Sequence, residues 1–156
     1  MPMNTKQLDS FQLVGISIRT SNQNQQAAQD IPALWQRFMQ DNVAANIPHK
    51  VGETVYCAYT EYEGDHNEPY TTLIGCQVTH LDEVPEGMKA IKVPAGQYRQ
   101  YTPKGKLSDG IIINQWFKIW ADDLNRTYQT DFEVYGEKAR DPNAVEVDIF
   151  IGVRAA

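Results

Sequence analysis

The chain has 156 residues with a formal net charge of -6, and its 42% hydrophobic and 22% charged residues are ordinary for a globular protein. This length is enough for one domain with a sizeable core, and the acidic balance argues against a nucleic-acid-binding surface. No apolar run approaches the roughly 18 residues of a membrane span, and the N-terminal MPMNTKQLDS lacks the apolar core of a secretory signal. We therefore expect a cytoplasmic protein that contacts neither nucleic acid nor membrane.

The first half of the chain predicts a strand, a helix and two further strands. In FQLVGISIRT, Val14, Ile16 and Ile18 alternate with small or polar residues, as in a strand with one apolar face. A polar segment then leads to an amphipathic helix, for which Asp30 is the expected N-cap and Pro32 lies in the first turn. The segments ETVYCAYTEY and YTTLIGCQVT follow as strands of a hairpin around EGDHNEP. The apolar stripe of the helix comprises Ile31, Leu34, Trp35, Phe38 and Met39.

The second half repeats this pattern. MKAIKVPAGQYRQY predicts a strand that Pro94 and Gly96 interrupt, which favours an edge or a bulge. Ser108 and Asp109 are expected to cap a second helix, and DFEVYGEK and EVDIFIGV close this half as strands. The stripe of the second helix comprises Ile112, Trp116, Ile119 and Trp120.

The two halves also share details. Each helix contains an isoleucine followed four residues later by a tryptophan, and each last strand contains an Ile-Gly step. The sequence therefore predicts one α+β domain over residues 1–156, built from two pseudo-symmetric strand–helix–strand–strand repeats, about 11–80 and about 88–154. Its expected elements are an antiparallel sheet and two main helices.

A ligand is expected at the seam between the two repeats, because clefts favour such interfaces. Each aromatic residue near this seam is, taken singly, typical of a helix–sheet core. Together, tyrosines on paired strands beside a glutamate also suit a flat cation, since aromatic faces attract cations and a carboxylate supplies the countercharge. The aromatic residues are Trp35, Phe38, Trp116, Phe117, Trp120, Tyr56, Tyr59, Tyr62, Phe132, Tyr135 and Phe150.

Glu133 stands inside the strand Phe-Glu-Val-Tyr, although carboxylates are depleted from strands and seldom buried without a partner. Parity places Asp131, Glu133 and Tyr135 on one face, and Phe132 and Val134 on the other. If Phe132 and Val134 pack on the helices, Glu133 points to the opposite side, and the pattern alone favours a solvated residue. If a cleft forms on its face instead, tyrosine hydroxyls would hold the carboxylate.

Catalytic and metal-binding patterns are weak. Cys57 and Cys76 fall in predicted strands, where we expect two buried thiols rather than a disulfide. His49, His66 and His80 form no metal-ligand spacing with either cysteine, so we expect no metal ion and no cofactor. The sequence contains no nucleophile elbow and no phosphate-binding glycine loop.

The segments VPAGQYRQYTPKG, NQWFKIW, DFEVYG and VEVDIFIGV resemble the GyrI-like effector-binding domain family, and the resemblance runs from about residue 11 to 153. This family includes the ligand-binding halves of multidrug-responsive AraC-type and MerR-type regulators, and stand-alone proteins of mobile integron cassettes. The most specific features are the Phe-Glu-Val-Tyr strand and the Pro-x-Gly-x-Tyr turn of Pro94, Gly96 and Tyr98. One departure is Arg99, because relatives commonly have alanine after the tyrosine.

The resemblance implies that Glu133 faces an aromatic cleft and meets lipophilic cations. The implied function is a stand-alone small-molecule-binding protein for lipophilic, drug-like organic cations, in transcription regulation or drug sensing, rather than an enzyme. About ten residues precede the first expected strand and almost none follow the last, so we expect no helix-turn-helix. The expected ligand-binding residues are Glu133, Tyr135, Trp116, Trp120, Tyr56, Tyr59, Phe38, Trp35 and Phe150.

Two other functions remain open at this point. Some relatives resemble hydrolases that use cleft carboxylates to open a strained ring on DNA-alkylating compounds, and Asp148 or Glu53 would then be the partner of Glu133. The family's namesake binds and inhibits DNA gyrase through surface contacts, which requires an exposed patch. The protein partner to consider is therefore DNA gyrase or a separate DNA-binding protein.

Overall fold

The computed structural model describes residues 5–65, 67–122 and 124–154. Within these ranges, helices α1 (Gln26–Gln40) and α2 (Ile111–Ala121) accompany an eight-stranded antiparallel sheet, which confirms the predicted α+β fold. No helix in these ranges is long and apolar enough to cross a membrane. The strands of the sheet, in spatial order, are β1 (Thr5–Leu8), β6 (Gly96–Tyr101), β10 (Asp148–Val153), β8 (Thr130–Tyr135), β3 (Lys50–Thr60), β4 (Tyr70–Val78), β2 (Phe11–Thr20) and β5 (Lys89–Val93).

The strand order shows two related halves. The first half contributes β3, β4 and β2, the second contributes β8, β10 and β6 in the matching order, and they meet where β3 pairs with β8. The edge strands are exchanged, because β1 pairs with β6 of the second half and β5 pairs with β2 of the first. The strand expected from residue 88 onward is therefore two strands, separated at Pro94, which cannot donate to a ladder.

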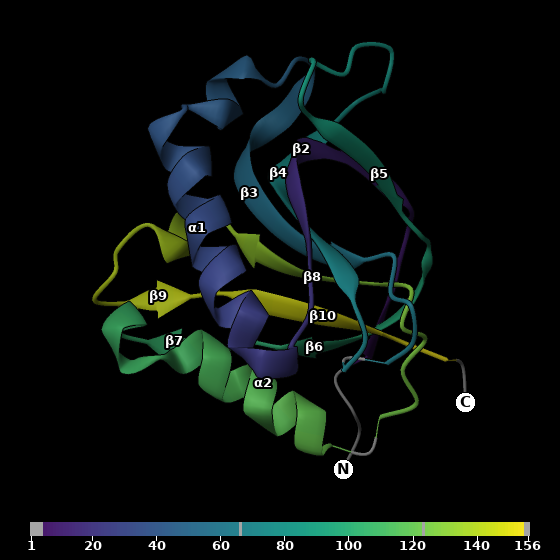
Figure 1. Ribbon diagram of the computed structural model, residues 1–156, viewed down its shortest axis with the longest axis vertical. Helices are drawn as coiled ribbons and strands as arrows, with labels where there is room; N and C mark the ends of the chain where they lie inside the picture. Colours follow the sequence, from purple (N-terminus) through teal and green to yellow (C-terminus); the bar gives the residue numbers. More distant parts are fainter. Residues whose placement is uncertain (1–4, 66, 123, 155–156) are drawn as a thin grey trace.

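The sheet curls so that its two ends approach each other (Figure 1). Two residues join β1 to β2, and two join β5 to β6, although these strands lie near opposite ends of the spatial order. Because a chain spans at most about 3.6 Å per residue, such short connections require a strongly bent sheet. The inside of the curl is a hydrophobic core that includes Leu13, Leu73, Val93, Tyr98, Phe132 and Phe150.

Both helices pack on the other face of the sheet, where they share a second core (Figure 1). Leu34 and Phe38 of α1 and Trp116 and Ile119 of α2 are the buried members of the expected stripes. Met39 is 70% exposed, so its inclusion in the stripe is wrong. Beyond the helices, a separate two-stranded sheet pairs β7 (Lys104–Gly105) with β9 (Val145–Glu146).

Helix α1 begins four residues before its expected cap. Asp30 lies inside the helix, where its carboxylate accepts hydrogen bonds from Thr20 Oγ1 at 2.9 Å and from Gln26 Nε2 at 3.1 Å. The residue is thus used to tie the helix to β2 rather than to cap it. Pro32 is also inside α1, beyond the first turn.

Helix α2 begins at Ile111, and the residues expected to cap it form a preceding 3-10 turn, Leu107–Asp109. Gly110 makes the junction with a φ of 69°, a left-handed conformation that glycine adopts without a steric penalty. Cys57 and Cys76 are free and buried, as predicted. His66 lies outside the described residues, whereas His49 and His80 lie with their ring centroids 3.9 Å apart.

Candidate ligand-binding site

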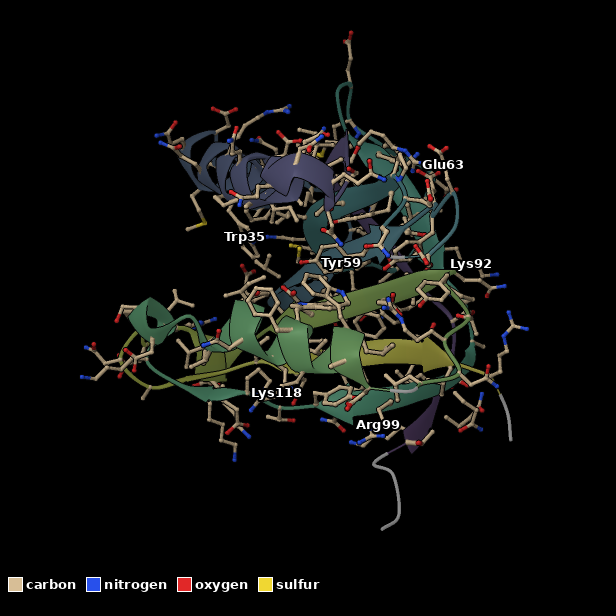
Figure 2. All side chains as sticks on the ribbon, turned by 60° about the horizontal axis from the view of Figure 1, so that its bottom comes forward. Trp35, Tyr59, Glu63, Lys92, Arg99 and Lys118 are labelled. Carbon is tan, nitrogen blue, oxygen red and sulfur yellow. The ribbon has the colours of Figure 1, made fainter. Side chains whose placement is uncertain are left out.

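A cavity of about 640 Å³ lies between the two helices and the outer face of the sheet. Figure 2 shows Trp35 and Tyr59 in the opening between α1 and α2. Strands β3 and β8, which join the two halves, contribute Tyr59 and Glu133 to its wall. The cavity therefore lies at the seam of the repeats. Its helical lining includes Ile31 and Trp35 of α1 and Ile112, Trp116, Phe117 and Trp120 of α2.

Glu133 is only 2% exposed and accepts three hydrogen bonds from neutral donors. Its Oε2 atom accepts from the Tyr59 hydroxyl at 2.9 Å and from the Trp116 indole N–H at 2.6 Å. Its Oε1 atom accepts from the Tyr135 hydroxyl at 2.5 Å. The three donors come from β3, α2 and β8, so the carboxylate joins the elements that form the cavity.

Burial raises the pKa of Glu133, and the hydrogen bonds from Tyr135, Trp116 and Tyr59 act in the opposite direction because they favour the charged form. Burial also raises the pKa of both tyrosine hydroxyls well above the ordinary value, so these groups remain neutral donors. Among the described residues, no lysine or arginine forms an ion pair with Glu133. When ionised, the carboxylate is therefore hydrogen-bonded but carries no compensating positive charge.

The core inside the curl of the sheet explains why parity alone pointed Glu133 toward solvent. Phe132 is buried inside the curl of the sheet and Val134 packs against the same core, so the assumption that they pack on the helices is wrong. Glu133 consequently lies on the helix-facing side, with Cys57 and Ile149 as cross-strand neighbours. Its burial excludes the solvated interpretation.

A buried ion pair lies beside the cavity. Arg126, which contributes to the cavity wall, donates from Nη2 to Asp131 Oδ2 at 2.7 Å. Asp131 also accepts from the Tyr62 hydroxyl at 2.6 Å and from the Gly152 amide at 2.8 Å. The Arg126 guanidinium carbon lies 4.4 Å from the centroid of the Tyr128 ring. The cavity wall thus combines an arginine that is paired with a buried aspartate and a separate glutamate without an ion-pair partner among the described residues.

All nine expected ligand-binding residues are described, and six of them line the cavity. Phe38 lies behind Trp35 in the core, with ring centroids 6.2 Å apart. Tyr56 precedes the helix-facing Cys57 along β3 and therefore points into the curl, where Phe150 stacks on Phe132 at 5.0 Å. The structure thus corrects the placement of Phe38, Tyr56 and Phe150, which do not line the cavity. The six that do are Glu133, Tyr135, Trp116, Trp120, Tyr59 and Trp35.

Sequence reasoning missed Tyr70 and Arg126 as lining residues. Tyr70 has a readable signal, because it shares strand parity with the helix-facing Ile74, which pairs with Cys57. Arg126 lies in an irregular segment before β8, where no periodicity predicts its burial.

The second carboxylate required by the hydrolase alternative is not where it was expected. Asp148 accepts hydrogen bonds from Gln100 Nε2 at 3.0 Å and Thr102 Oγ1 at 2.8 Å, outside the cavity. The Glu53 side chain is 73% exposed and pairs with Lys50. Neither residue is placed to share a substrate with Glu133.

Comparison with known proteins agrees with this fold. The family described as "Cass2: Integron-associated effector binding protein" matches residues 5–153. The chain belongs to this effector-binding family. Its membership confirms the resemblance to GyrI-like effector-binding domains.

Three known proteins are similar to the chain. It is 28% identical over 151 residues to YobU of Bacillus subtilis, a proposed transcriptional regulator, with 94% of each chain covered. It superimposes on the integron cassette protein VCH_CASS2, from the mobile metagenome of Vibrio cholerae, with a TM-score of 0.75 and 29% identity, covering 97% of this chain and 95% of that one. SAV2435, solved bound to tetraphenylphosphonium, shares the fold with a TM-score of 0.74 and 18% identity, over 99% and 95% of the respective chains.

Proposed function

We propose that this effector-binding protein captures lipophilic organic cations in the cavity between α1 and α2, with Glu133 as the countercharge. The observation that carries the proposal is a buried carboxylate that is held by three neutral donors and has no ion-pair partner among the described residues. A buried charge is costly unless it is paired. A cationic ligand would supply the missing charge.

The aromatic lining supports a flat or bulky apolar cation. Trp35 packs edge-on against Tyr135 at 4.8 Å, and Trp116 packs against Tyr59 at 5.3 Å, so ring faces and edges surround the glutamate. Aromatic faces attract cations, and the attraction is stronger where water is excluded. The tetraphenylphosphonium bound by SAV2435 is a ligand of this chemical class.

The hydrogen bonds on Glu133 favour cations that lack N–H donors. Oε2 already accepts two hydrogen bonds and Oε1 accepts one, so little acceptor capacity remains for a ligand. A primary ammonium loses strong hydration on entry and needs several acceptors in return. A quaternary or delocalised cation needs none, and the field of the carboxylate alone stabilises it.

A role in drug sensing or transcription regulation follows from the relatives rather than from the cavity. YobU is a proposed regulator that matches over nearly its whole length. We propose that cation binding in this protein serves the same kind of response, through a separate DNA-binding protein.

Titration calorimetry of tetraphenylphosphonium against the wild-type protein and Glu133→Gln tests the proposal. The variant keeps the shape and removes the charge, so binding should weaken by up to about 4 kcal/mol, the attraction of unit charges 4 Å apart at an effective dielectric constant of about 20. Triphenylmethanol, a neutral aromatic compound, serves as the control ligand and should bind both proteins equally. Equal affinity of both proteins for the cation would remove the case for Glu133 as countercharge.

A further inference from the structure

Arg126 has hydrogen-bonding capacity that its ion pair does not use. The residue is 6% exposed and its Nη2 atom donates to Asp131. Its Nε and Nη1 atoms are buried, and neither has a hydrogen-bond partner among the described residues. A guanidinium presents five N–H donors in a fixed plane and accepts nothing, so these unused groups are suited to an incoming acceptor.

Unused buried donors of a charged group are costly. Leaving one unsatisfied forfeits its hydration without replacement, and native structures contain few such groups. The Arg126 side chain also contributes to the wall of the cavity that holds Glu133. The unused donors therefore belong to a residue of the cavity wall.

We propose that Arg126 forms a second subsite of the cavity, which binds a neutral hydrogen-bond acceptor, such as a carbonyl oxygen, on a ligand whose cationic group lies near Glu133. This inference rests on the proposed function. It narrows the ligand class from lipophilic cations in general to cations that carry an acceptor on a side arm.

Charge at the subsite favours a neutral acceptor over an anion. Asp131 is fully buried and pairs with Arg126 at 2.7 Å, so the guanidinium charge is already compensated. An added carboxylate would leave a net negative charge in a buried place. A carbonyl oxygen satisfies the unused N–H groups without changing the charge.

The two subsites lie within the reach of one small molecule. Asp131 and Glu133 share a face of β8 two residues apart, a spacing of about 7 Å along a strand. Aromatic contacts continue between them, from Tyr59 to Tyr70 at 5.9 Å and from Tyr70 to Tyr62 at 5.6 Å. An apolar arm from the cation would follow these rings to Arg126.

Tyr128 covers one face of the Arg126 guanidinium. Its ring covers the guanidinium and packs edge-on against Tyr62 at 5.9 Å. Tyr128 itself is half-buried. The guanidinium N–H groups point outward in its plane, so a ring on its face leaves their directions to an acceptor.

A matched pair of ligands tests the subsite in the wild-type protein. Hexyltriphenylphosphonium and (5-oxohexyl)triphenylphosphonium differ by one methylene replaced by a carbonyl, and calorimetry gives the ratio of their dissociation constants. With an acceptor subsite, the ketone binds at least as tightly as the alkyl compound. Without one, its carbonyl is buried unpaired and the ketone binds about tenfold more weakly.

Two variants assign the effect to Arg126. Arg126→Lys keeps the positive charge beside Asp131 and removes the planar set of donors, and the double variant Arg126→Gln with Asp131→Asn removes both charges together. In each, the ratio of the ketone's dissociation constant to that of the alkyl compound should rise about tenfold relative to wild type. The double variant keeps the test valid if the lysine variant does not fold.

The outcomes separate the two proposals. Two results together overturn the Arg126 subsite and leave the proposed function intact. The alkyl compound binds Glu133→Gln more weakly than wild type, and the ketone binds wild type about tenfold more weakly than the alkyl compound does. The subsite is also overturned if the ratio of the two dissociation constants is the same in wild type and in both variants. If neither phosphonium binds wild type, both proposals fall.

Discussion

Trp116 donates its indole N–H to the Oε2 atom of Glu133 at 2.6 Å, which ties α2 to the central strand β8. The same oxygen accepts from Tyr59 on the adjacent strand β3. The group proposed to meet the ligand is therefore also a structural junction between one helix and the seam of the sheet. Changes to its partners should alter both stability and binding.

Trp116→Phe should destabilise the protein by about 1–3 kcal/mol, the cost of leaving a buried acceptor with one fewer donor. Loss of a donor to the charged form should also raise the pKa of Glu133 further. Denaturant unfolding measures the first effect. Trp35→Phe is the control, since Trp35 makes ring contacts at the cavity and no hydrogen bond to Glu133. Equal losses in the two variants would show that ring volume, not the hydrogen bond, sets the cost.

Cation binding should weaken as the pH falls, beginning above the ordinary glutamate value of 4.5, because burial raises the pKa of Glu133. Only the ionised carboxylate attracts the ligand, so protons compete with it. Calorimetry at a series of pH values with tetraphenylphosphonium, whose charge is fixed, measures the effect. In Glu133→Gln this dependence should vanish, and a retained dependence would assign it to another group.

The contribution of Glu133 to the stability of the ligand-free protein should have the opposite pH dependence and decrease as the pH rises. The raised pKa means that the folded state holds the Glu133 proton more tightly than the unfolded chain does. This contribution to stability is fully present below about pH 4.5 and is lost as the pH rises through the raised value. As the pH rises, the unfolding free energy of wild type should therefore fall relative to that of Glu133→Gln. Thermal or denaturant unfolding of both proteins measures this difference. A constant difference across this range would contradict it.

Trp35→Leu should weaken binding of an aromatic cation by about 0.5–2 kcal/mol through loss of a cavity face. Tyr56→Leu is the matched control on the opposite face of the sheet, where Tyr56 contacts Phe11 at 5.6 Å. That change should reduce stability and leave ligand affinity unaltered. Calorimetry and thermal unfolding of both variants separate the two effects, and a loss of affinity in Tyr56→Leu would contradict the assignment of faces.

Arg126→Met should cost about 3–5 kcal/mol, because it leaves the fully buried Asp131 without its charge partner. Arg37→Met breaks an exposed pair with Asp41, whose side chains are 53% and 64% exposed, and should cost only about 0.3–0.5 kcal/mol. Denaturant unfolding compares the two, and similar costs would mean that Asp131 is relaxed or hydrated without Arg126.

The helices and strands were largely predictable, because hydrophobic spacing reports the face that each element buries. Ile31 and Trp35, and Ile112 and Trp116, marked both helices and the two-fold repetition. The start of α1 was not predictable, since Asp30 has the side chain of a cap but is used to bind Thr20 and Gln26. A local signal of this kind does not reveal a tertiary partner.

The face of the site was harder to predict than its residues. Parity correctly grouped Glu133 with Tyr135, but both faces of this sheet are buried, so apolar Phe132 gave no indication of where the helices lie. The same ambiguity misplaced Tyr56 and Phe150. Arg126 could not be found at all, because its burial depends on an irregular segment and a partner five residues away.

The exchanged edge strands have a consequence for how the chain folds. Each half of the sheet is completed by a strand that belongs, in chain order, to the other half. Neither half can satisfy its edge alone, so we expect a single concerted unfolding transition rather than two separate ones. Many of these pairings join distant residues, for example Lys6 with Tyr98, and non-local pairing of this kind slows folding. Two fragments divided between Val78 and Lys89 should accordingly be unstructured apart and recover the native fold when mixed.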